Sequence, residues 1–131
     1  MKYLLDTNIC IAHLNRRDPE VRDRLIKLNA HDVFLCSVVK AELIFGARKS
    51  AHVQKNLTLL GHFFAGVRSL PFDDHAAELY GNHAAHLAQA GRSIGSNDLM
   101  IASIAQAHNL IVATRNDGEF MRIPGLRVSV W

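Results

Sequence analysis

The chain has 131 residues, the usual size of one domain, so we predict a single domain over residues 1–131. Its 49% apolar and 21% charged residues are typical of a soluble globular protein, and no apolar run approaches the roughly 18 residues of a membrane span. Lys and Arg number 15 against 12 Asp and Glu, and the net charge of +3 suits an anionic partner without identifying one.

The N-terminal segment reaches Asp6 too early for a signal peptide, so we expect a cytoplasmic protein. Cys10 and Cys36 both lie in apolar runs. Such positions favour two buried thiols over a disulfide or a zinc site.

Short apolar runs alternate with helical patterns along the chain. The runs predict strands over Tyr3–Leu5, Val33–Cys36, Val67–Leu70, Leu110–Ala113 and Leu126–Val130. The patterns between them predict helices over Asp18–Asn29, Val38–Ala47, Ser50–Gly66, Asp73–Ala90 and Ser96–His108. This alternation indicates an α/β fold whose mostly parallel sheet is covered on both faces, with any binding crevice at the carboxyl ends of the strands.

Three acids stand among apolar neighbours, whereas most of the others have the polar surroundings of a solvated surface. Asp6 directly follows the first strand, and Asp98 is the only charged residue from Ile94 through Thr114. Asp6 also fits a turn or N-cap residue, and Asp98 fits an acid that complements a helix dipole. Glu42 lies inside an apolar helix, away from its ends, where an acid usually faces a site.

Taken together, Asp6, Glu42 and Asp98 predict one acidic site. Carboxylates about 4 Å apart repel each other by roughly 4 kcal/mol at an effective dielectric of 20, and a divalent cation removes that repulsion. Oxygen ligands without a supporting His or Cys pattern favour Mg²⁺ or Mn²⁺, and we expect Asp6 and Asp98 to bind it. Such a metal suits phosphodiester hydrolysis, so a metal-dependent nuclease is predicted.

The motifs around these acids resemble the PIN-domain family, and the C-terminal part looks like the VapC-type toxins of toxin–antitoxin pairs. The segments that carry this resemblance are Leu5–Asn8, Ala41–Leu43 with Gly46-Ala47, Ile94–Ala102, Leu110–Asn116 and Glu119–Leu126. The resemblance covers the whole chain in order. It implies a three-layer α/β/α sandwich, a Mg²⁺- or Mn²⁺-dependent endoribonuclease, a homodimer, and a VapB-type antitoxin that inserts a peptide near the active site.

By the same resemblance, Asp6, Glu42 and Asp98 match the catalytic acids of the family. Its supporting polar residues correspond to Thr7, Asn8 and Thr114. Many family members have Asp where Asn116 stands, so the fourth acid differs in this chain. Glu119 fits the Glu-Phe pattern of a VapC subgroup and is preferred over Asp117 as the residue that completes the site.

Among the basic residues, Arg115 is the best candidate to bind the RNA backbone, because it follows Thr114 at a strand end. Solvated surface is the expected role of three weaker candidates, Arg48, Lys49 and Arg92. A tRNA is one substrate that the resemblance suggests, although no residue identifies the RNA. The alternative function is a non-catalytic nucleic-acid-binding or regulatory module within a DNA-bound toxin–antitoxin complex.

Overall fold

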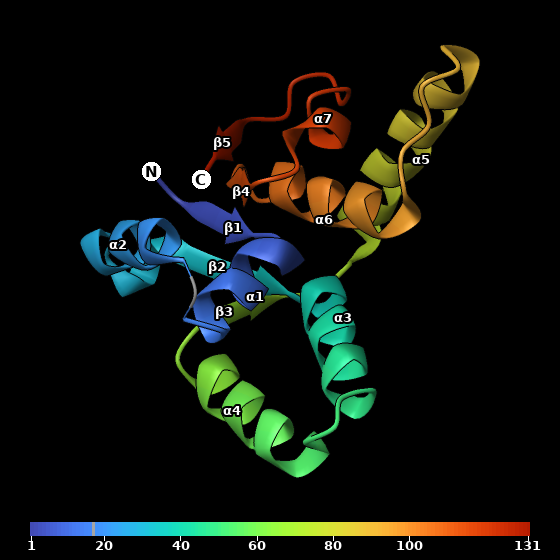
Figure 1. Ribbon diagram of the computed structural model, residues 1–131. Coiled ribbons are helices and arrows are strands. Elements are labelled where there is room, and N and C mark those ends of the chain that lie inside the picture. Colours follow the sequence, from blue (N-terminus) through green and yellow to red (C-terminus); the bar gives the residue numbers. More distant parts are fainter. Residues whose placement is uncertain (17) are drawn as a thin grey trace.

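The computed structural model describes residues 1–16 and 18–131, and in that part five parallel strands form one sheet (Figure 1). The strands are β1 (Tyr3–Leu5), β2 (Val33–Cys36), β3 (Arg68–Leu70), β4 (Ile111–Thr114) and β5 (Val128–Val130). Their order is β3-β2-β1-β4-β5, so the first strand lies at the centre. The register pairs Tyr3 with Val33 on one side and with Ile111 on the other.

Seven α-helices of the described residues flank this sheet (Figure 1). They are α1 (Thr7–Leu14), α2 (Pro19–Lys27), α3 (Ser37–Arg48), α4 (Val53–Ala65), α5 (Asp74–Gln89), α6 (Ser96–Ala107) and α7 (Asp117–Phe120). A short 3₁₀ helix, η1 (Ala30–Asp32), leads into β2. The predicted α/β/α sandwich with a parallel central sheet is confirmed.

All ten predicted strands and helices are present, Tyr3–Leu5 and Val33–Cys36 with unchanged ends and the others with ends shifted by up to three residues, but the first helix was not predicted. The polar cluster after the first strand is the start of α1, with Asp6 as its N-cap. The helix escapes a search for one apolar stripe because it contacts the protein on two sides. Ile9 and Cys10 are buried, while Ile11 and Leu14 line a groove beside α4.

Acids at helix starts shape the connections between the elements. Asp18 caps α2 by accepting hydrogen bonds from two backbone amides, and Pro19 is the first residue of that helix. Asp73 caps α5 by accepting from the amide of Ala76 at 2.9 Å. These are the N-cap and first-turn positions at which Asp and Pro are preferred.

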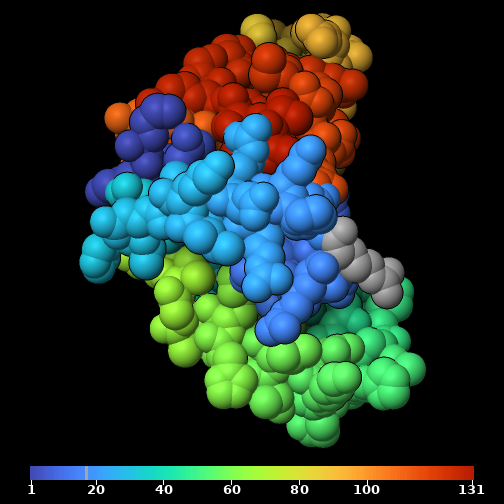
Figure 2. All heavy atoms as spheres, turned by 60° about the vertical axis from the view of Figure 1, so that its left-hand side comes forward, coloured from blue at the N-terminus to red at the C-terminus, as the bar shows by residue number. Residues whose placement is uncertain are grey.

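The core joins the central strands to α6, whose residues Ile101–Ala105 are all buried. The C-terminal Trp131 is 8% exposed and meets the ring of Tyr3 edge-on at 5.5 Å. In the space-filling view, α2 lies across one face between the C-terminal segment above it and α3 and α4 below (Figure 2). The guanidinium of Arg24 on α2 is 6.0 Å from the centre of the Trp131 ring, so α2 covers the C-terminus.

Both cysteines are buried and free, as predicted. Burial raises the pKa of the Cys36 thiol to about 11 and also raises that of Cys10 well above its ordinary value. In the described residues, no helix has the length and apolar character needed to cross a membrane.

Candidate active site

A pocket of about 220 Å³ opens where β1 and β4 end, at the carboxyl edge of the sheet. Its lining comes from four helices and two loops that are far apart in the sequence. The lining residues are Asp6, Thr7, Asn8, Glu42, Asp98, Asn116 and Phe120. The structure therefore brings Asp6, Glu42 and Asp98 together in one pocket.

Asp6 is held at the base of this pocket and is only 4% exposed. As the N-cap of α1, its Oδ1 accepts a hydrogen bond from the amide of Ile9 at 2.9 Å. The hydroxyl of Thr114, the last residue of β4, donates to Oδ2. Burial raises the pKa of the Asp6 carboxyl, and the bonds from Thr114 and Ile9 act against that rise.

The fully buried Thr114 hydroxyl also accepts a hydrogen bond from the amide of Asn116 at 2.9 Å. One hydroxyl thus ties the first carboxylate to the loop that follows β4. Asn116 is exposed and lines the pocket. It therefore lies beside the acids, at the position where many family members have Asp.

Glu42 reaches the pocket from the middle of α3. The hydroxyl of Thr7 donates to Oε1 of Glu42 at 2.7 Å and joins the first turn of α1 to α3. Asn8, the next residue on α1, is exposed and borders the same pocket. The polar side chains after β1 therefore divide their roles, since Asp6 contacts Thr114 and Thr7 contacts Glu42.

Asp98 lies in the first turn of α6 and shares a hydrogen bond with Glu119 of α7. Two carboxyl groups can form that bond only when one of them holds a proton. Burial first, then the bond to Glu119 and the charges of Glu119, Glu42 and Asp6, raise the pKa of Asp98 to about 7. Neither Glu119 nor Asp117 lines the pocket, but Glu119 contacts Asp98 and so joins the acidic cluster from its edge.

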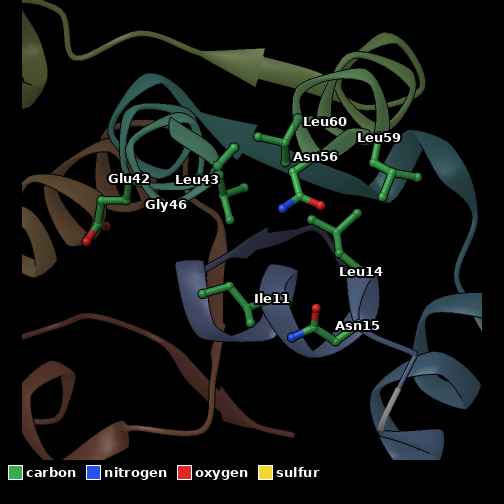
Figure 3. A pocket seen from close by; sticks show the side chains of 10 residues that line it. Ile11, Leu14, Asn15, Glu42, Leu43, Gly46, Asn56, Leu59 and Leu60 are labelled. Carbon is green, nitrogen blue, oxygen red and sulfur yellow. The ribbon is translucent and has the colours of Figure 1, made fainter. Parts of the chain in front are cut away.

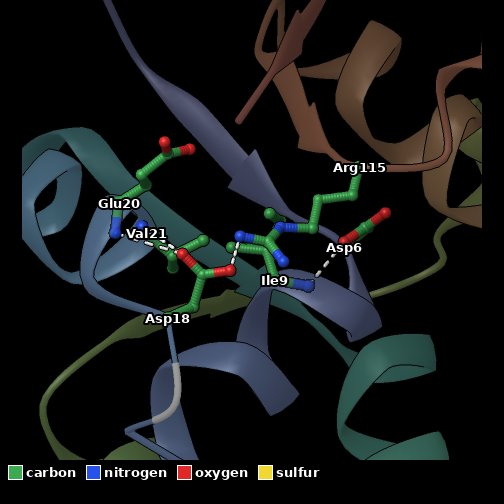
Figure 4. Close-up of polar contacts among 6 residues, drawn as sticks. All are labelled: Asp6, Ile9, Asp18, Glu20, Val21 and Arg115. Carbon is green, nitrogen blue, oxygen red and sulfur yellow. Dashed lines mark hydrogen bonds and ion pairs between the residues drawn. The ribbon is translucent and has the colours of Figure 1, made fainter.

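The structure includes two residues near the site that the sequence did not single out. Phe120 is 1% exposed and forms an apolar wall of the pocket. Asp18 is one of the acids with polar neighbours in the sequence. It forms an ion pair with Arg115, whose guanidinium extends to the start of α2 (Figure 4). Phe120 is the Phe of the Glu-Phe pattern, which was used only to select Glu119, whereas Asp18 is in no motif and only its proximity to Arg115 identifies it.

A second groove, of about 260 Å³, adjoins Glu42 and runs between α1, α3 and α4 (Figure 3). Leu43 and Leu60 project into it from α3 and α4, and Ile11 and Leu14 face them from α1. It is therefore a largely apolar channel that begins at one of the pocket acids.

Within residues 1–16 and 18–131, no group of three or more His, Cys, Asp and Glu side chains is arranged to hold a metal ion. The pocket carboxylates are instead partnered by hydroxyls and by one another.

This chain belongs to the PIN-domain family, whose model matches residues 3–126. It is 40% identical to a protein from Shigella flexneri named tRNA(fMet)-specific endonuclease VapC, over 100% of this chain and 98% of that protein. Ribonuclease VapC2 of Haemophilus influenzae is 36% identical with the same coverage.

Two solved complexes have the same fold over the full chain. The crystal structure of DNA-bound VapBC from Salmonella typhimurium matches with a TM-score of 0.93 and 37% identity, over 100% of this chain and 98% of that one. VapBC2 from Rickettsia felis, bound to a promoter DNA fragment, matches with a TM-score of 0.92 and 36% identity, over 100% and 99%.

Proposed function

We propose that this chain is an endoribonuclease toxin of a VapBC-type pair, which hydrolyses phosphodiester bonds in RNA and is neutralised by a VapB-type antitoxin. The full-length similarity to proteins named VapC ribonucleases carries the proposal. The pocket that gathers Asp6, Glu42 and Asp98 supplies the chemistry for it. The name of the Shigella relative supports a tRNA as substrate, and cellular RNA as substrate supports a cytoplasmic location.

We propose that Asp6 and Asp98 bind Mg²⁺ or Mn²⁺. The donor set fits these ions, because carboxylate oxygens are the ligands that hard cations prefer. Mg²⁺ is commonly held by one or two carboxylates and keeps several waters, so a site without three protein ligands suits it. Burial first, and then the neighbouring carboxylates, raise the pKa of Asp98 to about 7, and a bound cation would relieve the repulsion between these carboxylates. When bound, a divalent cation polarises the scissile phosphate and neutralises charge on the leaving oxygen.

The remaining residues would orient and balance these carboxylates. Thr114 holds one oxygen of Asp6 and leaves the carboxylate a fixed direction toward the pocket. Thr7 does the same for Glu42 from the facing helix. Glu119 contacts Asp98 and would orient that carboxyl when it becomes a ligand.

RNA cleavage with Mg²⁺ and with EDTA tests this function. We expect cleavage only with the metal, and we expect Asp98→Asn to reduce it by more than the roughly 10–100-fold that loss of an outer-shell partner costs. Sequencing the new 5′ ends after brief expression in cells would identify the RNA. Full activity of a folded Asp98→Asn protein would refute the catalytic assignment.

A regulatory module that only binds nucleic acid is the second candidate, because two of the matched VapBC complexes were crystallised with DNA. Such a module needs no acidic pocket. An absence of metal-dependent cleavage, together with promoter binding by the assembled complex, would favour it over the nuclease.

We propose that the groove beside Glu42 receives the antitoxin peptide. Its apolar lining is suited to an amphipathic segment, and its end at Glu42 brings a bound peptide to the acidic pocket (Figure 3). Leu59 on its rim is 47% exposed. Leu59→Glu is therefore expected to weaken inhibition by the antitoxin and to leave RNA cleavage unchanged.

We also propose a homodimer. Phe45 on α3 is 64% exposed, and with Val38, Ala41 and Met100 it lines an apolar hollow between α3 and α6. Exposed aromatic residues of this kind are typical of protein interfaces. Sedimentation velocity would test it, with Phe45→Glu expected to yield the monomer.

A further inference from the structure

One ion pair shorter than 4.0 Å is present among the described residues, and it lies beside the candidate active site. Nη2 of Arg115 contacts Oδ2 of Asp18, and the side chains are 39% and 17% exposed (Figure 4). The chain has 15 Lys and Arg and 12 Asp and Glu, so many other ion pairs are conceivable, yet this is the pair that forms within the described residues. It joins the loop after β4 to the start of α2.

Arg115 stands between two residues of the site. Thr114 before it donates a hydrogen bond to Asp6, and Asn116 after it lines the acidic pocket. Asn116 lines the pocket, so a phosphate bound there would lie near the backbone of Arg115. The guanidinium has five N–H donors suited to phosphate, yet here one edge of it is turned to Asp18.

Asp18 keeps other partners when Arg115 leaves it. Its Oδ1 accepts hydrogen bonds from the amides of Glu20 at 3.1 Å and Val21 at 3.2 Å, and only Oδ2 faces the arginine. The positive end of the α2 dipole stabilises the same carboxylate. Breaking the ion pair therefore leaves no buried charge unpaired, and a partly exposed pair of this type contributes little to stability.

We infer that Arg115 exchanges between Asp18 and a phosphate of the RNA strand, so that Asp18 acts as an internal competitor of the substrate. The inference rests on the proposed RNA cleavage. In the free protein, Asp18 neutralises Arg115 and weakens the attraction for polyanions in general. An RNA strand that reaches the pocket provides a phosphate that replaces the Asp18 carboxylate at Arg115. RNA that binds elsewhere on this surface provides no such phosphate, so it does not gain the contact with Arg115.

The chain offers a conservative test at Asp18. Asp18→Asn keeps the Oδ1 that caps α2 and replaces the oxygen that faces Arg115 with an amide nitrogen. Asp23→Asn, at an exposed acid of the same helix, makes the same change in net charge and is the matched control. Binding of a fluorescein-labelled single-stranded RNA is measured by anisotropy in EDTA over a series of salt concentrations, which separates binding from cleavage.

We expect Asp18→Asn to bind RNA about two- to fivefold more tightly at low salt, as loss of a weak competing ion pair implies. Arg115→Gln should bind more weakly and reduce the slope of log K against log salt by about 0.7, the value for one phosphate contact on a single strand. In the Arg115→Gln background, Asp18→Asn should have no effect beyond that of Asp23→Asn.

Four results would overturn the inference. Weaker binding in both Asp18→Asn and Arg115→Gln would make the pair a structural clamp. If Asp18→Asn and Asp23→Asn increase the affinity for RNA equally, the effect comes from net charge alone. If the unchanged protein does not bind RNA, no phosphate is available to replace Asp18. If the unchanged protein cleaves RNA with Mg²⁺ while these variants bind alike, the inference fails and the proposed function stands.

Discussion

The Thr114 side chain supports the site with a single hydroxyl, which donates to Asp6 and accepts from the amide of Asn116. Thr114→Val keeps the shape of the side chain and removes both bonds. Oδ2 of Asp6 then loses its partner in a buried setting, which costs about 1–3 kcal/mol, while the Asn116 amide loses its partner where water can reach it, at a smaller cost. We expect a lower free energy of unfolding by urea denaturation and a slower cleavage of RNA.

Thr114→Ser is the matched control, because it retains the hydroxyl and loses only a methyl group. It should recover most of the cleavage rate. A Thr114→Val protein as active as the unchanged one would show that Asp6 needs no orientation from β4.

A second residue-scale prediction separates Glu119 from Asp117. Both acids are on α7 and neither lines the pocket, but Glu119 contacts Asp98 and Asp117 has no such contact among the causes that raise the pKa of Asp98. Glu119→Gln keeps a donor for Asp98 and removes a charge, so it should slow cleavage by about 10-fold, the lower end of outer-shell effects. Asp117→Asn should change the cleavage rate by less than about twofold, because it removes no partner of Asp98. The reverse order, measured as single-turnover rates, would exclude Glu119 as the fourth acid.

At the scale of an element, the short α7 depends on one side chain to stay in place. Phe120 is 1% exposed and forms both part of the core and a wall of the acidic pocket. Phe120→Ala should lower the free energy of unfolding by about 3–5 kcal/mol and displace the neighbouring Glu119. Met121→Ala, next to it and 67% exposed, is the control and should leave both stability and cleavage nearly unchanged.

The direction of Glu119 follows from this element. Residues three apart share a face on a helical turn, so α7 places Glu119 on the same side as Asn116, its N-cap residue. That Glu119 then meets Asp98 depends on how α7 packs on α6. No spacing within the chain predicts that packing.

For the whole molecule, the acidic pocket links stability to pH and to metal. The pKa of Asp98 is about 7 in the metal-free fold and 3.8 in the reference state, so the folded protein holds a proton that the unfolded chain has released between these values. The free energy of unfolding therefore falls as pH rises through this range. Burial raises the pKa of Asp6 and acts in the same direction.

A cation that binds the deprotonated pocket should reverse this trend. We expect Mg²⁺ to raise the melting temperature more at about pH 8 than at about pH 6, because it competes with the proton on Asp98. Calorimetry of Asp98→Asn should show a smaller pH dependence without metal and little effect of Mg²⁺. An equal effect of Mg²⁺ at both pH values would mean that the ion binds outside the pocket.

The sequence by itself determined the α/β class, the strands that end at the pocket, and the three acids that converge there. These follow from local properties of the sequence. Apolar runs that alternate with helical patterns indicate a parallel sheet, and burying an acid among apolar residues costs free energy unless it has a partner or faces a site. Asp6 and Asp98 each also fit a capping or first-turn acid, so it was their occurrence together with Glu42 that selected the three.

Only the tertiary structure decided which side chains meet. Residue 6 contacts residue 114, residue 7 contacts residue 42, and residue 18 pairs with residue 115. The α1 helix was missed for the same cause, since it packs on two sides and shows no single apolar face. Such contacts depend on strand order and helix packing across the whole chain, and local residue patterns predict neither.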